Sequence, residues 1–305
     1  MDILQIQNLS KSFGNNKIID NLSFSVPEHS IFGFIGQNGA GKTTTMKMVL
    51  GLLKADSGSI SVCDEKVSFG QNTTNQYIGY LPDVPEFYHY MRPEEYLTLC
   101  GEVTGLTREN IKKRTEELLT LVGLHGVNKK IGGFSRGMKQ RLGIAQALLN
   151  EPRLLICDEP TSALDPVGRK EILDILKQVK GKTTVVFSTH ILSDVERICD
   201  HIAVLSKGKI ALSGTLSELK AQYKADCLVI EFANKKDKEQ FIAAPQIVPY
   251  MDKWEQTDTM ITFQVKDVSQ TEIVVLDVLS QNRILPLKLE VMEPTIESLF
   301  MEVVK

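Results

Sequence analysis

The sequence predicts an α/β fold that contains a helical subdomain, followed by a small α+β domain of the ferredoxin-like type. Three observations support this prediction. An apolar strand runs into a glycine-rich segment that opens a helix, apolar runs alternate with helical stretches in the middle of the chain, and the last third follows the order β-α-β-β-α-β. We expect two domains, at residues 1–220 and 225–305, with the helical subdomain at about 88–150.

The first 220 residues show the alternation that is typical of a largely parallel sheet covered by helices. Between residues 92 and 149, apolar residues recur at helical spacing beside charged neighbours, which predicts the helical subdomain. Further helices are expected near residues 169–179 and 191–198. Strands are expected at Ile3–Gln7, Ile18–Val26, Ser30–Ile35, Leu154–Cys157, Thr183–Phe187 and Ile202–Leu205.

Beyond about residue 224 the pattern is that of a ferredoxin-like domain. Ser269 and Glu272 form a candidate capping box at the start of its second helix. A last helix is expected where Ile296, Phe300 and Val303 recur at helical spacing. The other expected elements are strands at Cys227–Phe232, near Ile247–Glu255, near Met260–Val265 and at Leu287–Met292, and a helix near Lys235–Ile242.

Composition and charge exclude several classes of protein. The 305 residues are 42% hydrophobic and 24% charged, as in globular proteins, and a net charge of −3 with scattered basic residues predicts no nucleic-acid partner. The N-terminus lacks a secretory pattern and no stretch of about 18 apolar residues occurs, so we expect a soluble or peripheral cytoplasmic protein. Five cysteines without a CxxC pair are expected to be reduced and mostly buried.

A phosphate-binding loop is predicted where the strand SIFGFI gives way to a helix. Glycines let successive N–H groups point at phosphates, and the helix N-terminus favours negative charge there. Lys42 is expected to reach the β- and γ-phosphates and Thr43 to hold Mg²⁺. The alternative is a structural glycine turn. The candidate nucleotide-binding residues are Gly36, Gln37, Asn38, Gly39, Ala40, Gly41, Lys42, Thr43 and Thr44.

Two carboxylates end the apolar strand LLIC. Asp158 is a candidate for orienting Mg²⁺, and Glu159 is a candidate general base that polarises the attacking water. An apolar strand that ends in two acids is by itself more often a solvated strand end. Together with the phosphate loop, the pair predicts phosphoryl-transfer chemistry.

Across about residues 1–220 the chain resembles the nucleotide-binding domain of ATP-binding-cassette (ABC) proteins. The family's motifs occur in order: GQNGAGKTT as Walker A, FSRGMKQ as the signature, LLICDE as Walker B and SALD as the D-loop, with His190 in FSTHILSD as the switch histidine. The resemblance implies ATP and Mg²⁺ as cofactors, Phe13 stacked on adenine, and a catalytic set of Lys42, Glu159 and His190.

The resemblance also implies a head-to-tail dimer, with a second copy or with a paralogue. In such a dimer, Ser135 and Gly137 of one chain face the γ-phosphate that the other chain binds, and Asp165 communicates across the interface. On sequence alone, a Ser at position 135 would be an ordinary helix cap and His190 an ordinary strand-end histidine.

Two motifs depart from the family pattern. Arg136 and Met138 replace one glycine and the glutamine of the signature, and Asp83 in IGYLPD occupies the position of the Q-loop glutamine. An ionised aspartate accepts hydrogen bonds but donates none, and it is a further candidate ligand of Mg²⁺. We expect its replacement by asparagine to change the ATPase rate modestly.

SRGMKQR, GYLPD, the C-terminal domain and the ending EPTIESLFMEV resemble ATPases of bacitracin- and daunorubicin-type exporters. This implies separate ABC-2 type membrane subunits as partners, a peripheral place on the cytoplasmic face of the membrane, and an antibiotic, peptide or ion as cargo. In this family a short helix of the membrane subunit docks beside the helical subdomain, and Tyr88, Tyr90 and Tyr96 are candidates for lining that cleft.

Three other functions remain open at this point. Asn234–Asp237 fits the NKxD pattern and Asp165–Gly168 fits DxxG, both of which occur in GTP-binding switches. A soluble ABC ATPase of DNA repair or translation would usually carry tandem cassettes or long insertions, which this chain lacks. A partner that binds ATP without hydrolysing it would be expected to lack some of the catalytic residues named above.

Overall fold

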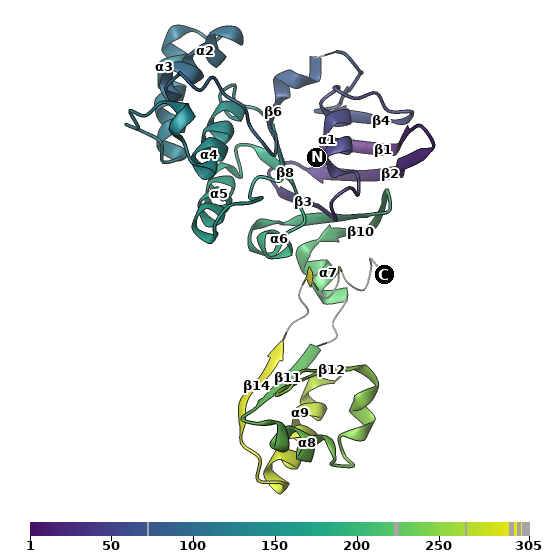
Figure 1. The fold of residues 1–305 in the computed structure, drawn as a ribbon. Helices are drawn as coiled ribbons and strands as arrows, with labels where there is room; N and C mark the ends of the chain where they lie inside the picture. Colours follow the sequence, from purple (N-terminus) through teal and green to yellow (C-terminus); the bar gives the residue numbers. More distant parts are fainter. Residues whose placement is uncertain (72, 223–225, 266, 293–295, 298–299, 301–305) are drawn as a thin grey trace. The chain divides into compact units, whose positions relative to one another are not determined.

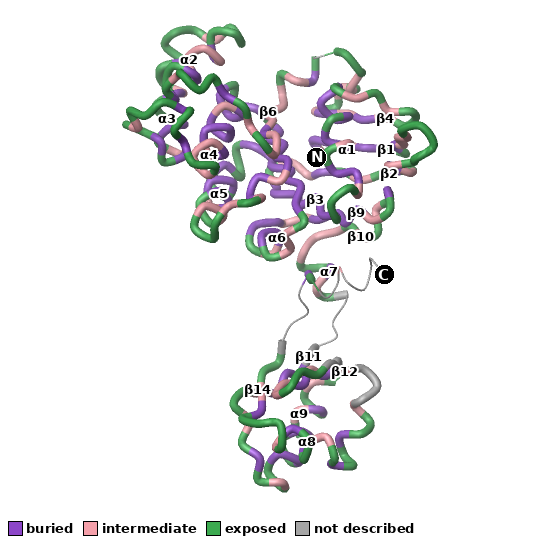
Figure 2. Tube along the Cα trace, in the orientation of Figure 1, coloured by how far each residue is buried: buried purple, intermediate pink, exposed green. Residues whose placement is uncertain are grey.

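The computed structural model describes residues 1–305 except 72, 223–225, 266, 293–295, 298–299 and 301–305. The chain divides into two compact units, residues 1–216 and 217–303 (Figure 1). Each unit has its own cluster of buried apolar side chains, drawn in purple in Figure 2. No helix among the described residues combines the length and the hydropathy that a membrane span requires.

An antiparallel sheet of four strands forms one side of the first unit. Apolar residues such as Leu4, Ile6 and Ile19 are buried, while polar neighbours on the same strands stay in contact with solvent. Phe13 pairs with Asn16 where the first two strands turn, so its ring lies at the tip of a hairpin. The strands are, in sheet order, β2 (Asn16–Pro27), β1 (Asp2–Phe13), β4 (Ser57–Val62) and β5 (Glu65–Lys66).

The second sheet of this unit has six strands, and every pairing except that of the edge strand β10 is parallel. Every residue of the central strands β3, β7 and β8 is buried, as expected for a sheet covered on both faces. Their carboxyl ends therefore meet at one edge of the sheet, where α/β proteins bind ligands. The sheet order is β10 (Lys209–Thr215), β9 (His201–Ser206), β3 (Ile31–Gly36), β8 (Thr184–Thr189), β7 (Leu154–Asp158) and β6 (Ile78–Leu81).

Helices α2, α3 and α4 lie together beside the second sheet and make up the helical region that the sequence predicts (Figure 1). Thr107 and Ser135 accept hydrogen bonds from N–H groups in the first turns of α3 and α4, which is why these helices begin where they do. The helices are α1 (Lys42–Val49), α2 (Pro93–Val103), α3 (Arg108–Leu121), α4 (Arg136–Ala147), α5 (Pro166–Val179), α6 (Leu192–Ile198) and α7 (Leu216–Gln222), with short 3₁₀ helices at Thr73–Tyr77 and Ile131–Gly133.

The second unit is a four-stranded antiparallel sheet with two main helices. Its sheet order β12-β13-β11-β14 is that of a split β-α-β fold, so the predicted ferredoxin-like class is confirmed. Phe232, Phe241 and Phe263 form the centre of its core. The elements are β11 (Asp226–Phe232), α8 (Lys235–Ile242), β12 (Trp254–Gln256), β13 (Met260–Val265), α9 (Val268–Gln281) and β14 (Pro286–Met292).

Two local predictions in this unit are wrong. Most of the strand expected near Ile247–Glu255 is a 3₁₀ helix at Val248–Lys253, because a proline in its first turn fits a helix start and cannot donate to a ladder. The cap of α9 is Asp267, whose side chain accepts from the N–H of Gln270, and not Ser269. Most of the last predicted helix lies outside the described residues.

Candidate active site

The glycine-rich loop joins β3 to α1 in a conformation that requires glycine. Gly39 and Gly41 have φ angles of 82° and 109°, in the left-handed region. A Cβ on Gly41 would lie 2.5 Å from Cδ1 of Ile19, so a larger residue has no room there. The first N–H groups of α1 lack partners within the helix and face the loop, as in anion-binding sites.

Lys42 is buried, with only 5% of its surface exposed, at the start of α1. Its ammonium group donates to the carbonyl oxygen of Gly36 at 2.6 Å and lies 3.1 Å from Oε1 of Glu159. A buried lysine is costly unless its charge is compensated. These contacts hold the ammonium group between the loop and the carboxylates that follow β7.

Thr43 and Asp158 contact each other at the ends of α1 and β7. The hydroxyl group of Thr43 donates to Oδ2 of Asp158 at 2.7 Å. The hydroxyl group of Ser188, on β8, donates to Oδ1 of the same carboxylate at 2.5 Å. Asp158 is therefore fixed from both sides and is 3% exposed. The sequence motifs predict that Thr43 and Asp158 serve a Mg²⁺ ion, and they assign no role to Ser188.

Glu159 stands in a strained backbone conformation, with φ of 47°. Its N–H group donates to Oγ of Ser188 at 3.1 Å, which holds the turn in place. Its Oε2 lies 2.9 Å from Nδ1 of His190, whereas its buried Oε1 accepts no hydrogen bond from any described residue. Lys42 is within ion-pair distance of that oxygen but not in hydrogen-bonding geometry.

A cavity of about 510 Å³ opens over these residues. It brings together most of the residues that the motifs predict, and it adds Ser162, the first residue of SALD, and Ile18, which belongs to no motif. Gly36 and Ala40 shape the loop without lining the cavity, and Asp158 reaches it through Thr43. The lining residues are Phe13, Ile18, Gln37, Asn38, Gly39, Gly41, Lys42, Thr43, Thr44, Asp83, Glu159, Ser162 and His190.

Phe13 lies on the wall of this cavity with 51% of its surface exposed. The ammonium group of Lys11 lies 5.4 Å from its ring centroid, a cation–π distance. An exposed aromatic ring at a cavity wall offers a stacking surface for a flat heterocycle. This is the position that the sequence predicts for an adenine contact.

Asp83 follows β6 and lines the same cavity. Its carboxylate, 47% exposed, lies 3.4 Å from the guanidinium group of Arg136 in the first turn of α4. Burial, and after it the negative charges of Asp158 and Asp83, raise the pKa of Tyr80, on β6, to about 12. Asp83 and Asp158 thus act electrostatically on the same tyrosine at this end of the sheet.

Three further predicted residues, Ser135, Gly137 and Asp165, are not among the described residues that line the cavity. Ser135 caps α4 by accepting from the N–H of Met138 at 3.2 Å, and Gly137 lies in the first turn of that helix. Asp165 caps α5 by accepting from the N–H of Gly168 at 2.9 Å. Their expected action across a dimer stays a prediction.

The oxygen-rich end of the cavity suits a Mg²⁺ ion. The hydroxyl group of Thr43 and the carboxylate of Asp158 are hard oxygen donors only 2.7 Å apart, which is the donor set that Mg²⁺ prefers beside phosphates. The buried Oε1 of Glu159, which pairs with Lys42 but accepts no hydrogen bond from any described residue, is an acceptor that a bound water would satisfy. The residues present therefore fit a Mg²⁺–nucleoside triphosphate complex.

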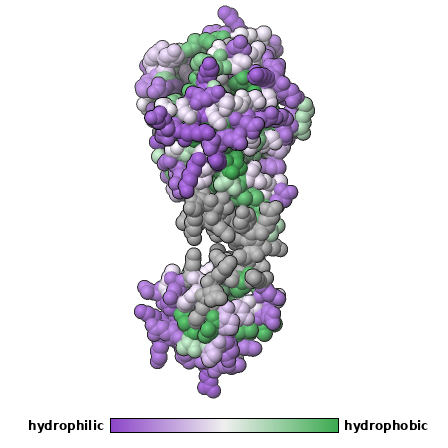
Figure 3. All heavy atoms as spheres, turned by 90° about the vertical axis from the view of Figure 1, so that its right-hand side faces the viewer, coloured by the Kyte–Doolittle hydropathy of each residue, from purple (hydrophilic) through white to green (hydrophobic). Residues whose placement is uncertain are grey.

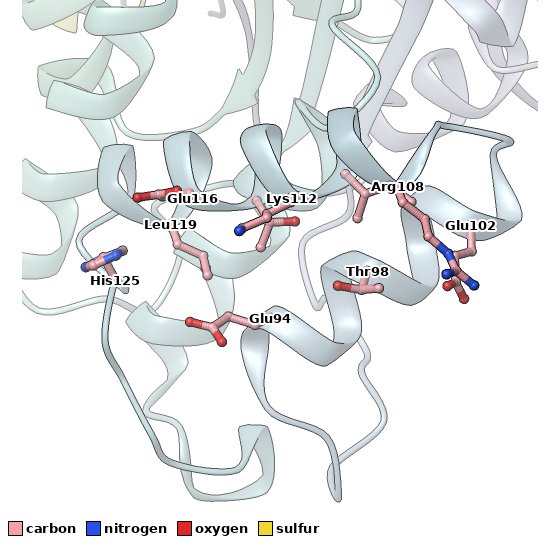
Figure 4. Close-up of a pocket in the computed structure, with 10 residues that line it drawn as sticks. Glu94, Thr98, Glu102, Arg108, Lys112, Glu116, Leu119 and His125 are labelled. Carbon is pink, nitrogen blue, oxygen red and sulfur yellow. The ribbon is translucent and has the colours of Figure 1, made fainter.

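A second cavity of about 510 Å³ lies between α2 and α3 (Figure 4). Glu94, Thr98 and Glu102 line it from α2, Lys112 lines it from α3, and His125 lines it from the segment after α3. It contains none of the residues that the motifs single out, and acidic and basic groups mix along it. The faces of the two units in Figure 3 are likewise mostly hydrophilic, with small separate hydrophobic areas.

The glycine loop at the end of β3, together with the paired carboxylates at the end of the nearby strand β7, defines a P-loop nucleotide-binding protein. Comparisons with known proteins identify the family. Residues 19–162 match the family model described as ABC transporter, and residues 214–304 match the C-terminal domain of DrrA1-3-like ATP-binding proteins. The chain belongs to the ATP-binding subunits of ABC transporters and is an ATPase.

Three relatives illustrate the similarity. The linearmycin resistance ATP-binding protein LnrL of Bacillus subtilis is 33% identical over 98% of this chain and 97% of its own length. The bacitracin transport ATP-binding protein BcrA of Bacillus licheniformis is 41% identical over 68% of each chain. A solved ATP-binding subunit of an ABC transporter, 33% identical, superimposes with a TM-score of 0.66 over 72% of this chain and 93% of that chain.

Proposed function

We propose that the chain hydrolyses Mg²⁺-ATP at the cavity over Lys42 and Glu159, as one half of a head-to-tail dimer, and powers separate ABC-2 type membrane subunits. The observation that supports hydrolysis most directly is the carboxylate of Glu159. His190 holds its Oε2, while its buried Oε1 lies at ion-pair distance from Lys42 and accepts no hydrogen bond from any described residue. A carboxylate oriented in this way is a general base placed for one water molecule.

Each residue of the site has a role in this proposal. The phosphate loop binds the phosphates through N–H groups and through Lys42. Thr43 and Asp158 hold Mg²⁺, which neutralises phosphate charge and orients the phosphates. Glu159 takes the proton of the attacking water, and His190 fixes the direction of that carboxylate. Phe13 stacks on adenine.

The proposed dimer completes the site. Ser135 and Gly137 lie outside the cavity of their own chain, which supports a role at the γ-phosphate bound by the other chain. Asp165 at the cap of α5 would communicate across the interface. The partner is a second copy or a paralogue. We also propose that residues 1–220 and 225–305 act as two domains.

The proposed docking site for a helix of the membrane subunit is a cavity of about 960 Å³ between α2, β6 and α4. Tyr88 and Val103 line it and are 53% and 78% exposed, so apolar surface faces solvent in a concave place. Tyr96 also lines it, and its hydroxyl group donates to Gln146 at 3.0 Å. Tyr90 is not among its lining residues.

The relatives support a role in export. Two of them are named for bacitracin transport and linearmycin resistance, and the second unit matches a domain of DrrA1-3-like proteins. We therefore propose that the cargo is an antibiotic, a peptide or an ion. In this assembly the chain lies on the cytoplasmic face of the membrane, bound to the membrane subunits.

The test is size-exclusion chromatography with light scattering of the full-length Glu159→Gln variant, without nucleotide and with Mg²⁺-ATP or Mg²⁺-GTP. We expect a dimer only with ATP, because slowed hydrolysis traps the closed state. Lys42→Ala in the same background is the control and should abolish the dimer. A monomer throughout, with ATP binding intact, would contradict a dimer of identical chains.

GTP is included because of the NKxD pattern at Asn234–Asp237. In the structure Asn234 caps α8 by accepting from the N–H of Asp237 at 2.9 Å. The described residues that line the nucleotide cavity include none of this segment. A helix cap accounts for the pattern. A dimer formed as readily with GTP would favour the GTP-binding switch.

A further inference from the structure

Asp83 and Arg136 are the two positions at which the chain departs most from the family pattern, and the structure places them in contact. They are 53 residues apart in the sequence, yet Oδ1 of Asp83 lies 3.4 Å from Nη2 of Arg136. Asp83 lines the nucleotide cavity, whereas Arg136 does not. The contact therefore joins that cavity to the first turn of α4, next to Ser135.

The main chain around Asp83 is fixed to α4 independently of this ion pair. Gln140 on α4 is fully buried, and its side-chain amide donates to the carbonyl oxygen of Asp83 at 2.7 Å. Gly143 on the same helix lets α4 approach so closely that a Cβ there would lie 2.5 Å from Leu81 and 3.4 Å from Pro85. The carboxylate of Asp83 can thus turn while its backbone stays in place.

The ion pair itself is weak. The side chains of Asp83 and Arg136 are 47% and 45% exposed, and the atoms are 3.4 Å apart. Exposed pairs of this kind contribute roughly 0.2–1 kcal/mol. A carboxylate that ligates a divalent cation directly is held more strongly than a carboxylate in such an exposed ion pair. Because Thr43 lines the same cavity, the metal end and Asp83 share one solvent space.

We propose that Arg136 and nucleotide-bound Mg²⁺ compete for the carboxylate of Asp83, so that metal binding frees the guanidinium group of Arg136 at the start of α4. This inference rests on the proposed Mg²⁺-ATP site. Asp83 and Arg136 act here as positioning residues. Asp83 reports the metal, and Arg136 transmits the change to the segment that holds Ser135 and Gly137.

The test is isothermal titration calorimetry of the full-length protein with a non-hydrolysable ATP analogue, in Mg²⁺ and in EDTA. The ratio of the two affinities measures the metal contribution. We expect Asp83→Asn to lower this ratio about two- to five-fold, and Arg136→Ala to raise it by a similar factor, since the exchanged pair is weak. In the Asp83→Asn background, Arg136→Ala should have no effect on the ratio.

Arg197→Ala is the matched control. Arg197 pairs with Asp174 at 3.0 Å with side chains 37% and 42% exposed, and neither residue lines the nucleotide cavity. Its ratio should equal that of the unmodified protein, and equal melting temperatures of all variants would show that they are folded.

The outcomes separate this inference from the proposed function. A ratio that Asp83→Asn leaves unchanged would overturn the competition, as would an equal effect of Arg136→Ala in both backgrounds. If the unmodified protein binds no ATP analogue in either condition, the proposed function itself fails. If it binds the analogue and only the ratios fail to move, the proposed function stands without this link.

Discussion

Ser188 holds both carboxylates at the end of β7, although the sequence analysis assigns it no role within FSTHILSD. It donates to Asp158 at 2.5 Å, and its hydroxyl oxygen also accepts from the N–H of Glu159 at 3.1 Å. One hydroxyl group thus orients a proposed metal ligand and the backbone of the proposed general base. Partners that orient metal ligands in this way are themselves needed for metal affinity and activity.

We expect Ser188→Ala to lower the rate of ATP hydrolysis roughly ten-fold or more, because the carboxylate of Asp158 loses its donor and the N–H group of Glu159 keeps only the carbonyl oxygen of residue 188, at 3.2 Å, as acceptor. Steady-state phosphate release at saturating Mg²⁺-ATP is the measurement. Ser206→Ala, at the end of β9, which β3 separates from β8 in the sheet, is the control and should keep the parent rate. A Ser188→Ala rate within two-fold of the parent would remove Ser188 from the working site.

The predictability of the site follows from how local each contact is. The glycine loop and the two carboxylates are read from short runs of sequence, because one strand and one turn place them. Ser188 lies 30 residues from Asp158, and Arg136 lies 53 residues from Asp83, so no local pattern reveals these pairs. Only the order of the strands in the sheet brings Ser188 to Asp158.

At the scale of elements, α5, α6 and the turn after β7 are joined through Asp194. Its carboxylate, 3% exposed, accepts from Arg169 on α5 at 2.7 Å and from the hydroxyl group of Thr161 at 2.7 Å. Thr161 follows Glu159 by two residues, and α6 begins two residues after His190. These hydrogen bonds therefore hold the segment that follows Glu159 and the segment that follows His190 in fixed positions relative to each other.

We expect Asp194→Ala to lower the free energy of unfolding by roughly 2–4 kcal/mol, since it leaves a buried hydroxyl group and a partly buried guanidinium group without their acceptor. This loss of stability is smaller than that expected for breaking a fully buried ion pair, because the side chain of Arg169 is 30% exposed. Urea unfolding followed by circular dichroism measures it. Arg197→Ala, which breaks an exposed pair, should cost at most about 1 kcal/mol. Equal losses in the two variants would contradict this account.

Strands and helices differ in how well the sequence reveals them. The buried strands β3, β7 and β8 are continuous apolar runs, and they occur close to where they are predicted. Four strands are missed: β4, β5, β6 and β10. β5 has two residues, β6 has four, and β10 exposes alternate residues at a sheet edge, so their apolar signal is weak. The cap of α9 is misplaced because Asp267 competes with Ser269 two residues earlier.

At the scale of the whole molecule, the two units have separate cores. Ile6, Phe34 and Leu154 belong to the core of the first unit, and Leu228, Phe241 and Phe263 to that of the second. Separate cores are the physical basis for independent folding of domains. ATP binding needs only residues of the first unit, since all residues that line the nucleotide cavity lie there.

We expect a chain that ends at residue 222 to bind ATP within about two-fold of the full-length affinity, because its cavity and core are complete. In the Glu159→Gln background this truncated chain should form less ATP-dependent dimer than the full chain, if the second unit strengthens the dimer. Calorimetry and light scattering measure the two properties. Undiminished dimerisation of the folded truncation would remove the second unit from that role.

The hairpin of β1 and β2 has a consequence for the length of the ligand. It carries Phe13 at its tip. Its Ile19 fills the space that a Cβ on Gly41 would need. Phe13, the proposed contact of the base, and the phosphate loop thus belong to one packed part of the first unit. The distance between them is therefore fixed. Adenosine or free triphosphate engages one end of this span, whereas ATP reaches both, and each bound end raises the effective concentration of the other.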